Sequence, residues 1–224
     1  MNKRCNINQI KIYIVLILPM ALIGCVAYYP QAVDIPLIKE KGDLRIDGGF
    51  ATPSFPFYVH GTVSYGLTNV MATQVYGSLD FYGRYCIQGA VGFFKKFESE
   101  NIIEFYGGYR HGNTFKFDVN FNNHLAFAQF NIGKTNQGKL NMDYGLGLRS
   151  GYLRVNFEEY LFGGNNTPHS ANGLVIEPSV FFRFGNEEKK IGFKINYLYT
   201  KIVEEHYRWP FSISLSTNFS ISTR

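Results

Sequence analysis

The chain has 224 residues and a formal net charge of +5, with 17% aromatic and only 17% charged residues. An average soluble domain has about 25% charged residues, and a composition so rich in aromatics excludes an intrinsically disordered protein. The length indicates one domain, or at most two small ones. No basic stripe accompanies the positive charge, so no nucleic-acid partner is expected.

Residues 1–24 have the pattern of an export signal. Lys3, Arg4 and Lys11 form a positive start, and an apolar run over 12–23, interrupted by one proline, follows them. The alternative is a membrane anchor, because the run from Ile12 to Tyr29 has 18 residues, close to the ~20 that a spanning helix needs. The proline weakens such a helix and no positive flank follows it, so we predict a signal peptide.

The signal ends in Leu22-Ile23-Gly24-Cys25, which resembles the lipobox of bacterial lipoproteins. The resemblance implies cleavage before Cys25 and acylation of its thiol and new amino group, and two or more acyl chains anchor a protein stably. Loss of Cys5 with the signal leaves Cys86 as the one free thiol, which excludes an intramolecular disulfide in the mature chain. We expect Cys86 to be a small packed residue.

The next segment, 25–42, contains Pro30 and Pro36 and has no periodicity, so we interpret it as an extended tether. From residue 43 onward the sequence alternates between apolar and polar residues. The clearest case is 211–222, where apolar residues alternate with serine and asparagine over twelve positions, as in a strand with one apolar face. Similar alternation predicts nine more strands, at 42–51, 57–67, 70–79, 85–95, 102–113, 124–133, 140–149, 174–185 and 191–200.

Most of these ten strands have ten or more residues. Strands of globular proteins have ~5–6 residues, whereas membrane-spanning strands need ~9–11. The pattern therefore predicts an all-β fold over 43–224, an antiparallel up-and-down transmembrane β-barrel of about 10 strands, with 8 and 12 as the alternatives. Closure also removes the unpaired edges that a long open sheet would expose.

The expected connections alternate in length, as in outer-membrane barrels. Short turns are expected near 68–69, 98–101, 134–137 and 186–189. Longer loops are expected near 52–56, 80–84, 114–123, 158–173 and 201–208.

The two faces of the expected strands differ in polarity. One face is apolar and includes tyrosines suited to the membrane interfaces, whereas the other has glycine, serine, asparagine and charges of both signs. In a barrel of this size such charges would pair and largely fill the lumen, so no wide pore is expected. These charged residues are Glu104, Arg110, Asp143, Arg149, Glu177, Arg183 and Lys194.

Two positions do not fit the simple alternation. Pro178 lies inside an expected strand, where it loses a ladder hydrogen bond, so this strand is expected to begin at Ser179 or to contain a bulge. After Gly151 the apolar residues change parity, which indicates either a bulge or the emergence of the strand from the membrane.

Several segments resemble one known family. They are Tyr28-Tyr29-Pro30, Asp34-Ile35-Pro36-Leu37-Ile38-Lys39-Glu40-Lys41-Gly42-Asp43, Ser64-Tyr65-Gly66-Leu67-Thr68, Gln88-Gly89-Ala90 and Glu104-x-Tyr106-Gly107-Gly108. Over roughly 22–150 the chain resembles a family of Bacteroidetes outer-membrane lipoproteins, in which a lipobox precedes a P-L-x-K-E-K-G segment and a β-rich body. The resemblance implies an envelope location and a barrel-like fold, but no activity and no catalytic residue.

The sequence has no pattern typical of a phosphate-binding loop, a zinc protease or a serine hydrolase. Its histidines lie in or near the expected long loops and would gather at one rim, where a histidine oriented by a carboxylate could act as a general base. They are His60, His111, His124, His169 and His206. Polar loops contain histidines for other reasons, so we assign no catalytic, cofactor-binding or metal-binding residue and predict that the protein is not an enzyme.

The leading hypothesis is a structural or surface-interaction protein of the outer membrane, which would contact a surface partner through the loops 114–123, 158–173 and 201–208. Its expected partners are outer-membrane lipid and the barrel-assembly machinery. One alternative is a lipid-modifying rim enzyme that uses His60, His111 or His206. Another is a lipid-anchored soluble β-calyx that binds a small apolar ligand.

Overall fold

The computed structural model describes residues 28, 33–52, 57–116, 119–137, 141–159, 167–200 and 211–222. The expected signal peptide and Cys25 therefore lie outside the described residues. Within the described ranges, no helix is long and apolar enough to cross a membrane.

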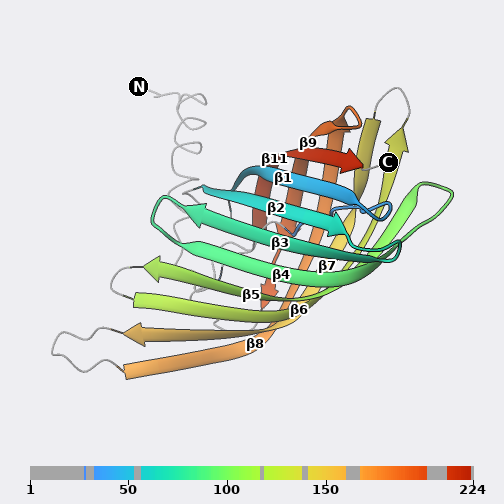
Figure 1. Ribbon diagram of the computed structural model, residues 1–224. Coiled ribbons are helices and arrows are strands. Elements are labelled where there is room, and N and C mark those ends of the chain that lie inside the picture. Colours follow the sequence, from blue (N-terminus) through green and yellow to red (C-terminus); the bar gives the residue numbers. More distant parts are fainter. Residues whose placement is uncertain are drawn as a thin grey trace, which may run out of the picture.

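Eleven β-strands form one antiparallel sheet that closes on itself (Figure 1). Neighbours in sequence are paired from β1 to β9, β11 lies between β9 and β1, and the short β10 continues β9 along β8. The wall of the barrel thus has ten strand positions, which confirms the predicted fold. The strands are β1 (Asp43–Thr52), β2 (Tyr58–Gly66), β3 (Met71–Asp80), β4 (Tyr85–Lys96), β5 (Asn101–Lys116), β6 (Val119–Gln137), β7 (Asn141–Glu159), β8 (Thr167–Gly185), β9 (Lys189–Tyr197), β10 (Tyr199–Thr200) and β11 (Phe211–Ser222).

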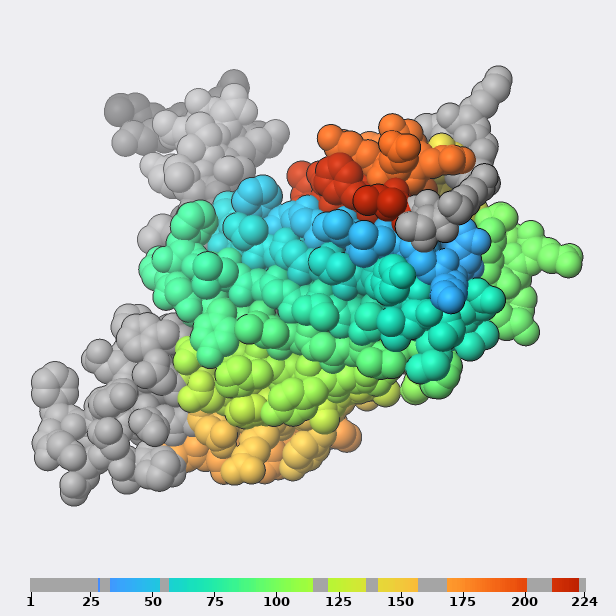
Figure 2. Space-filling view, viewed as in Figure 1, coloured from blue at the N-terminus to red at the C-terminus, as the bar shows by residue number. Residues whose placement is uncertain are grey.

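The barrel has an apolar outer face and a polar interior. Phe105, Val75 and Leu215 are more than half exposed on the outside, whereas Arg110, Arg149 and Arg183 are fully buried in the lumen. An apolar belt of this extent requires an apolar surrounding, and a spanning barrel presents it to lipid. The outer surfaces of β1 to β4 form a continuous wall in Figure 2.

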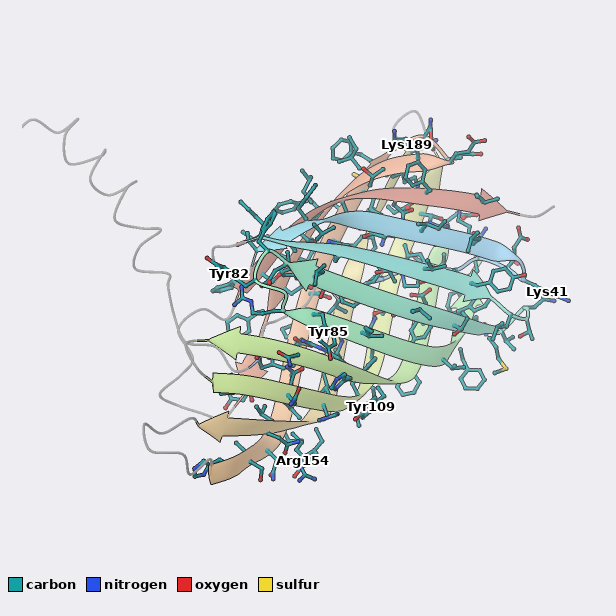
Figure 3. The ribbon with its side chains drawn as sticks, turned by 60° about the vertical axis from the view of Figure 1, so that its left-hand side comes forward. Lys41, Tyr82, Tyr85, Tyr109, Arg154 and Lys189 are labelled. Carbon is teal, nitrogen blue, oxygen red and sulfur yellow. The ribbon has the colours of Figure 1, made fainter. Side chains whose placement is uncertain are left out.

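The two mouths of the barrel differ. The mouth of short turns contains the start of β1 at Asp43 and the turn between β8 and β9, and the opposite mouth contains the longer connections. Figure 3 shows Lys41 at the short-turn mouth and Tyr82 at the opposite, long-loop mouth. Long loops are extracellular and short turns periplasmic in barrels of this kind, which orients the chain.

The wall is much higher on one side of the long-loop mouth than on the other. The strands β6, β7 and β8 have 19 residues each, whereas β2 has 9 and β3 has 10. In Figure 1 the ends of β5 to β8 extend well beyond those of β1 to β3. The expectation of long loops at 114–123 and 158–173 was therefore wrong in extent, because most of these polar residues continue the strands beyond the apolar belt.

The change of parity after Gly151 comes from the side chains and not from the backbone. β7 pairs residue by residue with both β6 and β8, without a bulge. Leu153 and Val155 are buried on the inner face, and Arg154 points outward. The polarity of the two faces is thus exchanged where the strand leaves the apolar belt. Of the two explanations, a bulge or the emergence of the strand from the membrane, the pairing leaves the second.

Pro178 lies inside β8, opposite Leu148 of β7, so β8 neither begins at Ser179 nor contains a bulge along β7. On its other side, the pairing of β8 with β9 begins at Ser179 and its pairing with β10 ends at Ile176. The interruption coincides with the residue that lacks a backbone N–H, and it separates β10 from β9.

Candidate functional site: the occupied lumen

A segment of the chain that precedes β1 lies inside the barrel. The side chains of Val33, Ile35, Leu37 and Ile38 are fully buried, and Asp34 is only 3% exposed. Val33, Ile35 and Leu37 pack with Ile102 of β5 and Phe181 of β8 in one apolar cluster, and Ile38 belongs to a second cluster. We call residues 33–38 the lumen segment; they belong to the stretch expected as a tether.

The backbone of the lumen segment is not part of the sheet, and side chains of the wall satisfy its polar groups. The N–H of Val33 donates to Asn196 Oδ1 at 3.3 Å, and that of Ile38 donates to Glu104 Oε1 at 2.8 Å. Gln129 Nε2 donates to the carbonyl of Asp34 at 2.7 Å, and Arg183 Nη2 donates to the carbonyl of Ile35 at 2.6 Å. Buried backbone groups without partners would cost free energy, so these contacts fix the path of the segment.

The carboxylate of Asp34 connects several strands. Its Oδ1 lies 2.7 Å from Nζ of Lys194 on β9 and 3.4 Å from Nη2 of Arg183 on β8. Its Oδ2 accepts a hydrogen bond from Gln74 Nε2 on β3 at 3.3 Å. Lys194 also lies 3.4 Å from Asp47 on β1. A single lysine of β9 is thus paired both with the lumen segment and with β1.

Tyr28 forms a second anchor, earlier in the chain. Its hydroxyl donates to Glu177 Oε1 at 3.2 Å and accepts from Arg110 Nη1 at 2.7 Å. The guanidinium of Arg110 lies over the tyrosine ring, 4.3 Å from its centroid, an arrangement that adds a cation–π attraction. Glu177 is in turn paired with Arg149 at 3.2 Å.

The buried charges of the described residues balance. Six basic and six acidic side chains are buried, and His60 is the one buried histidine among them. Buried charges are tolerated when they are paired and hydrogen-bonded, and this arrangement matches the expected filling of the lumen by charges of both signs. The twelve residues are Arg45, Arg110, Arg149, Arg183, Lys190, Lys194, Asp34, Asp43, Asp47, Glu104, Asp143 and Glu177.

The described histidines all lie toward the long-loop ends of their strands, but their side chains face different ways. His60 is buried in the lumen with its ring stacked on Tyr76 at a centroid distance of 6.1 Å. His111 and His124 are direct neighbours on β5 and β6, with ring centroids 4.8 Å apart. His169 lies on β8, near its start, and His206 lies outside the described residues. His60, the third residue of β2, faces the interior, on the opposite side of the wall from His111 and His124.

The tyrosines bonded to these histidines face outward. Tyr85 OH lies 3.3 Å from His111 Nε2, and Tyr109 OH lies 2.7 Å from His124 Nδ1. Figure 3 shows Tyr85 and Tyr109 along the outside of the wall, with Arg154 farther along the high side. A catalytic histidine is usually oriented by a carboxylate within hydrogen-bond reach, and the partners that His111 and His124 have here are tyrosine hydroxyls. Within the described ranges, no group of three or more metal-ligating side chains is present.

The short-turn mouth has an open groove of about 920 Å³, lined by charged residues that include Lys39, Glu40, Lys96, Glu187 and Glu188. Cys86, expected as a small packed residue, is buried on β4 as a free thiol. The sequence analysis missed the role of Asp34. The apolar residues on both sides of this single acid were visible in the sequence, but nothing in the sequence assigns them to the lumen.

No family model matches this chain, and no curated protein matches it either. Solved structures that are similar include the N-terminal β-barrel domain of Pseudomonas aeruginosa OprF, with 11% identity, a TM-score of 0.39, and coverage of 81% of this chain and 99% of that one. The KdgM porin in complex with disordered oligogalacturonate has 12% identity, a TM-score of 0.43, and coverage of 79% and 99%. Ail of Yersinia pestis has 11% identity, a TM-score of 0.29, and coverage of 81% and 99%.

The location follows from the chain's own geometry. A closed antiparallel barrel with an apolar outer belt, short turns at one mouth and longer connections at the other is the architecture that spans bacterial outer membranes. The protein is an outer-membrane β-barrel.

Proposed function

We propose that the protein is a closed outer-membrane barrel, lipidated at Cys25, with a structural or surface-interaction role and no wide pore. The observation that supports a closed barrel without a wide pore is the lumen segment, whose side chains are buried and whose polar groups bond to the wall at four backbone positions. A permeation path along the barrel axis would have to displace it.

Displacing the segment would also separate charges. Moving Asp34 away leaves Lys194 and Arg183 without this partner inside the barrel, and leaving a buried charge without its partner costs about 3–5 kcal/mol. The closed state is therefore the stable one, in contrast to a porin, whose interior contains a water-filled channel.

The high side of the wall is the surface that we propose for partners. Beyond the apolar belt, Arg154 of β7 is exposed on the outer face of the sheet, which is polar there. β5 ends and β6 begins at this side, at Lys116 and Val119, and so do β7 and β8, at Glu159 and Thr167. Outer-membrane lipid and the barrel-assembly machinery remain the other partners that we propose, and membership of the Bacteroidetes lipoprotein family remains a proposal from the sequence.

The two alternative functions have less support. Of the three histidines named for a rim enzyme, His60 is buried in the lumen and His111 is bonded to a tyrosine hydroxyl, whereas His206 lies outside the described residues. A calyx requires an apolar interior and a polar exterior, and this barrel has the opposite arrangement over its belt. Neither alternative is favoured by a specific contact.

Conductance measurements in planar bilayers test the absence of a pore. We expect the refolded wild type to give no steady channel. A variant with Ile35, Leu37 and Ile38 replaced by serine and with Asp34→Ser removes the apolar packing and the ion pairs of the segment, and should open channels intermittently. A matched control replaces the outward-facing residues Val75, Leu79 and Val91 by alanine. A steady, large conductance of the wild type would contradict the proposal.

Labelling with palmitate tests the lipid. Wild-type protein should incorporate it and the Cys25→Ala variant should not. The same variant, extracted in detergent and compared boiled and unboiled on a gel, should still show heat-dependent mobility, because the barrel is built by its strands. Equal labelling of both forms would remove Cys25 as the lipidation site.

A further inference from the structure

Three successive rows of outward-facing residues on β5 to β8 change from apolar to cationic to amide toward the long-loop mouth. The pairing of the four strands sets the members of each row side by side. The apolar row is Tyr109, Ala126, Tyr152 and Leu174, the cationic row is His111, His124, Arg154 and Asn172, and the amide row is Asn113, Asn122, Asn156 and Ser170. None of these described positions is an aspartate or a glutamate, so the cations have no carboxylate partner within the rows.

The cationic row lies where the apolar belt ends. On β7 the outward-facing residues from Met142 to Tyr152 are apolar apart from Ser150. Tyr152 is ten residues beyond Met142, which corresponds to ~25 Å along the barrel for a strand that rises ~3.3 Å per residue and is tilted by ~40°. This is the height of the apolar band of an outer-membrane barrel, which aromatic girdles flank. Arg154 therefore lies at the level of the outer-leaflet headgroups.

Arg154 offers unused donors at this level. Its side chain is exposed, and its Nε donates to Asn156 Oδ1 at 3.2 Å. Within the described ranges, its two terminal amino groups have no hydrogen-bond partner. A guanidinium group binds a phosphate through two parallel hydrogen bonds, and Figure 3 shows Arg154 on the outside of the high wall, as such a contact requires.

His111 and His124 extend the cationic row on the two neighbouring strands. Their ring centroids are 4.8 Å apart, and the hydroxyls of Tyr85 and Tyr109 hold the two rings in place. Tyr109 bonds to Nδ1 of His124, so Nε2 donates whenever the ring is protonated or Nδ1 accepts from the tyrosine. His124 is directly opposite Arg154. Like charges in such a pair destabilise a sheet, and an anion bound to both would offset their repulsion.

The wall below His124 carries small side chains. In the apolar row Ala126 lies between Tyr109 and Tyr152. The next row toward the membrane centre continues this pattern with Gly107, Ala128 and Ser150. A Cβ atom at Gly107 would have nothing within 4 Å, so the space outside this row is open. An acyl chain can therefore lie against β6 directly below His124.

We infer that Arg154 and His124, with His111 beside them, bind the phosphate of an outer-leaflet lipid whose acyl chain lies along β6. The cationic and apolar rows are continuous, which suits an amphiphile. A soluble anion would use the cations but not the open apolar face below them. This inference rests on the proposed lipid partner and gives it a position and a chemistry. It depends neither on acylation of Cys25 nor on the absence of a pore.

Binding of diphosphorylated lipid A to the refolded barrel in detergent, followed by native mass spectrometry, tests this position. The wild type should retain the lipid and should bind a dephosphorylated lipid A about tenfold more weakly, because charge-assisted hydrogen bonds to the phosphate are lost. The variant His124→Gln with Arg154→Gln should bind the diphosphorylated form about tenfold more weakly than the wild type and should bind the dephosphorylated form unchanged.

The matched control is Lys95→Gln with Lys134→Gln, which removes two cations from the outer wall near its short-turn end. The control should bind lipid A as the wild type does. An equal loss in both variants would reduce the effect to net charge and overturn the position. Equal binding of the two lipid forms by the wild type would remove the phosphate from the proposal. Displacement of the lipid by the same concentration of inorganic phosphate would make the free anion the ligand and overturn the lipid.

Heat-dependent gel mobility establishes that each variant is folded. Arg154→Gln alone provides the same comparison if the double variant is not. The closed lumen and the acylation of Cys25 have their own measurements, conductance and palmitate labelling. A wild type that forms no channel and incorporates palmitate, but does not bind lipid A, would overturn this inference and leave those two proposals intact.

Discussion

The carboxylate of Asp34 lies 2.7 Å from the ammonium group of Lys194, although 160 residues separate the two in sequence. Lys194 lies on β9, near the end of the chain, and Asp34 lies before the first strand. The contact therefore joins the beginning of the chain to the last part of the barrel, across the interior.

Replacing Asp34 by asparagine should destabilise the barrel. The change keeps the shape of the side chain but removes the carboxylate from Arg183 and leaves Lys194 with Asp47 alone, and breaking a buried pair costs about 3–5 kcal/mol. The temperature at which the detergent-extracted barrel loses its unboiled gel mobility should fall clearly. The control is Glu100→Gln, which removes a half-exposed pair with Lys96 at 3.1 Å and should cost at most about 1 kcal/mol. Equal effects of the two changes would mean that the Asp34 contact is not structural.

Two glycines of the wall, Gly147 on β7 and Gly107 on β5, provide a matched test of lumen packing. A Cβ atom at Gly147 would lie 2.7 Å from Cδ1 of Ile35 and 2.6 Å from Oγ of Ser179, whereas a Cβ at Gly107 would have nothing within 4 Å. Gly147→Ala should therefore destabilise the barrel by about 1–3 kcal/mol through overpacking. Gly107→Ala should be neutral or stabilising by up to about 1 kcal/mol. The same thermal assay measures both, and a neutral Gly147→Ala would show that the lumen segment yields without cost.

Lys39, at the short-turn mouth, should make stability depend on alkaline pH. Burial lowers the pKa of Lys39, and the positive charge of Arg45 lowers it further. In the unfolded chain Lys39 has an ordinary lysine pKa of about 10.4 and therefore binds its proton more tightly than in the folded barrel. The Lys39 charge thus lowers the free energy of unfolding at neutral pH, and this destabilisation disappears as the pH rises toward the unfolded-state pKa. Lys39→Gln should stabilise the barrel at pH 7, with an advantage that shrinks toward pH 10. A difference that stays constant with pH would contradict this account.

Removing the paired histidines should leave lipid A unchanged. His111 and His124 bond to the hydroxyls of Tyr85 and Tyr109, an arrangement in which each hydroxyl orients a ring. Mass spectrometry of lipid A from cells with the wild type and with His111→Ala and His124→Ala should give the same species. A species that disappears only in the variant would revive the rim enzyme.

The strands could be predicted from the sequence because their signal is local. The alternation over 211–222 and the lengths of the other segments depend only on which face each residue occupies, and β1 to β4 begin and end within a residue or two of the expected positions. The high side of the wall could not be predicted in this way. Outside the membrane the faces of β6, β7 and β8 exchange polarity, so the strand pattern there resembles a polar loop.

The occupied lumen was not predictable for a different reason. The segment 33–38 has no periodicity, because each residue is surrounded by the wall on all sides and no face is distinguished. Its partners, such as Asn196 and Gln129, are common residues of a polar barrel face, and nothing in the sequence pairs them with a segment more than 90 residues away. The filling by opposite charges was visible in composition, but the identity of each pair required the register.

The contact between Asp34 and Lys194 also constrains the order of assembly. A chain is made from its amino end, so Asp34 is synthesised long before its partner on β9. In the same way, β1 can complete its pairing only after β11, from Phe211 to Ser222, has been made. Long-range contacts of this kind form slowly. Until the seam between β1 and β11 closes, the future contents of the lumen lie at an open edge, and closing that seam captures them in one step.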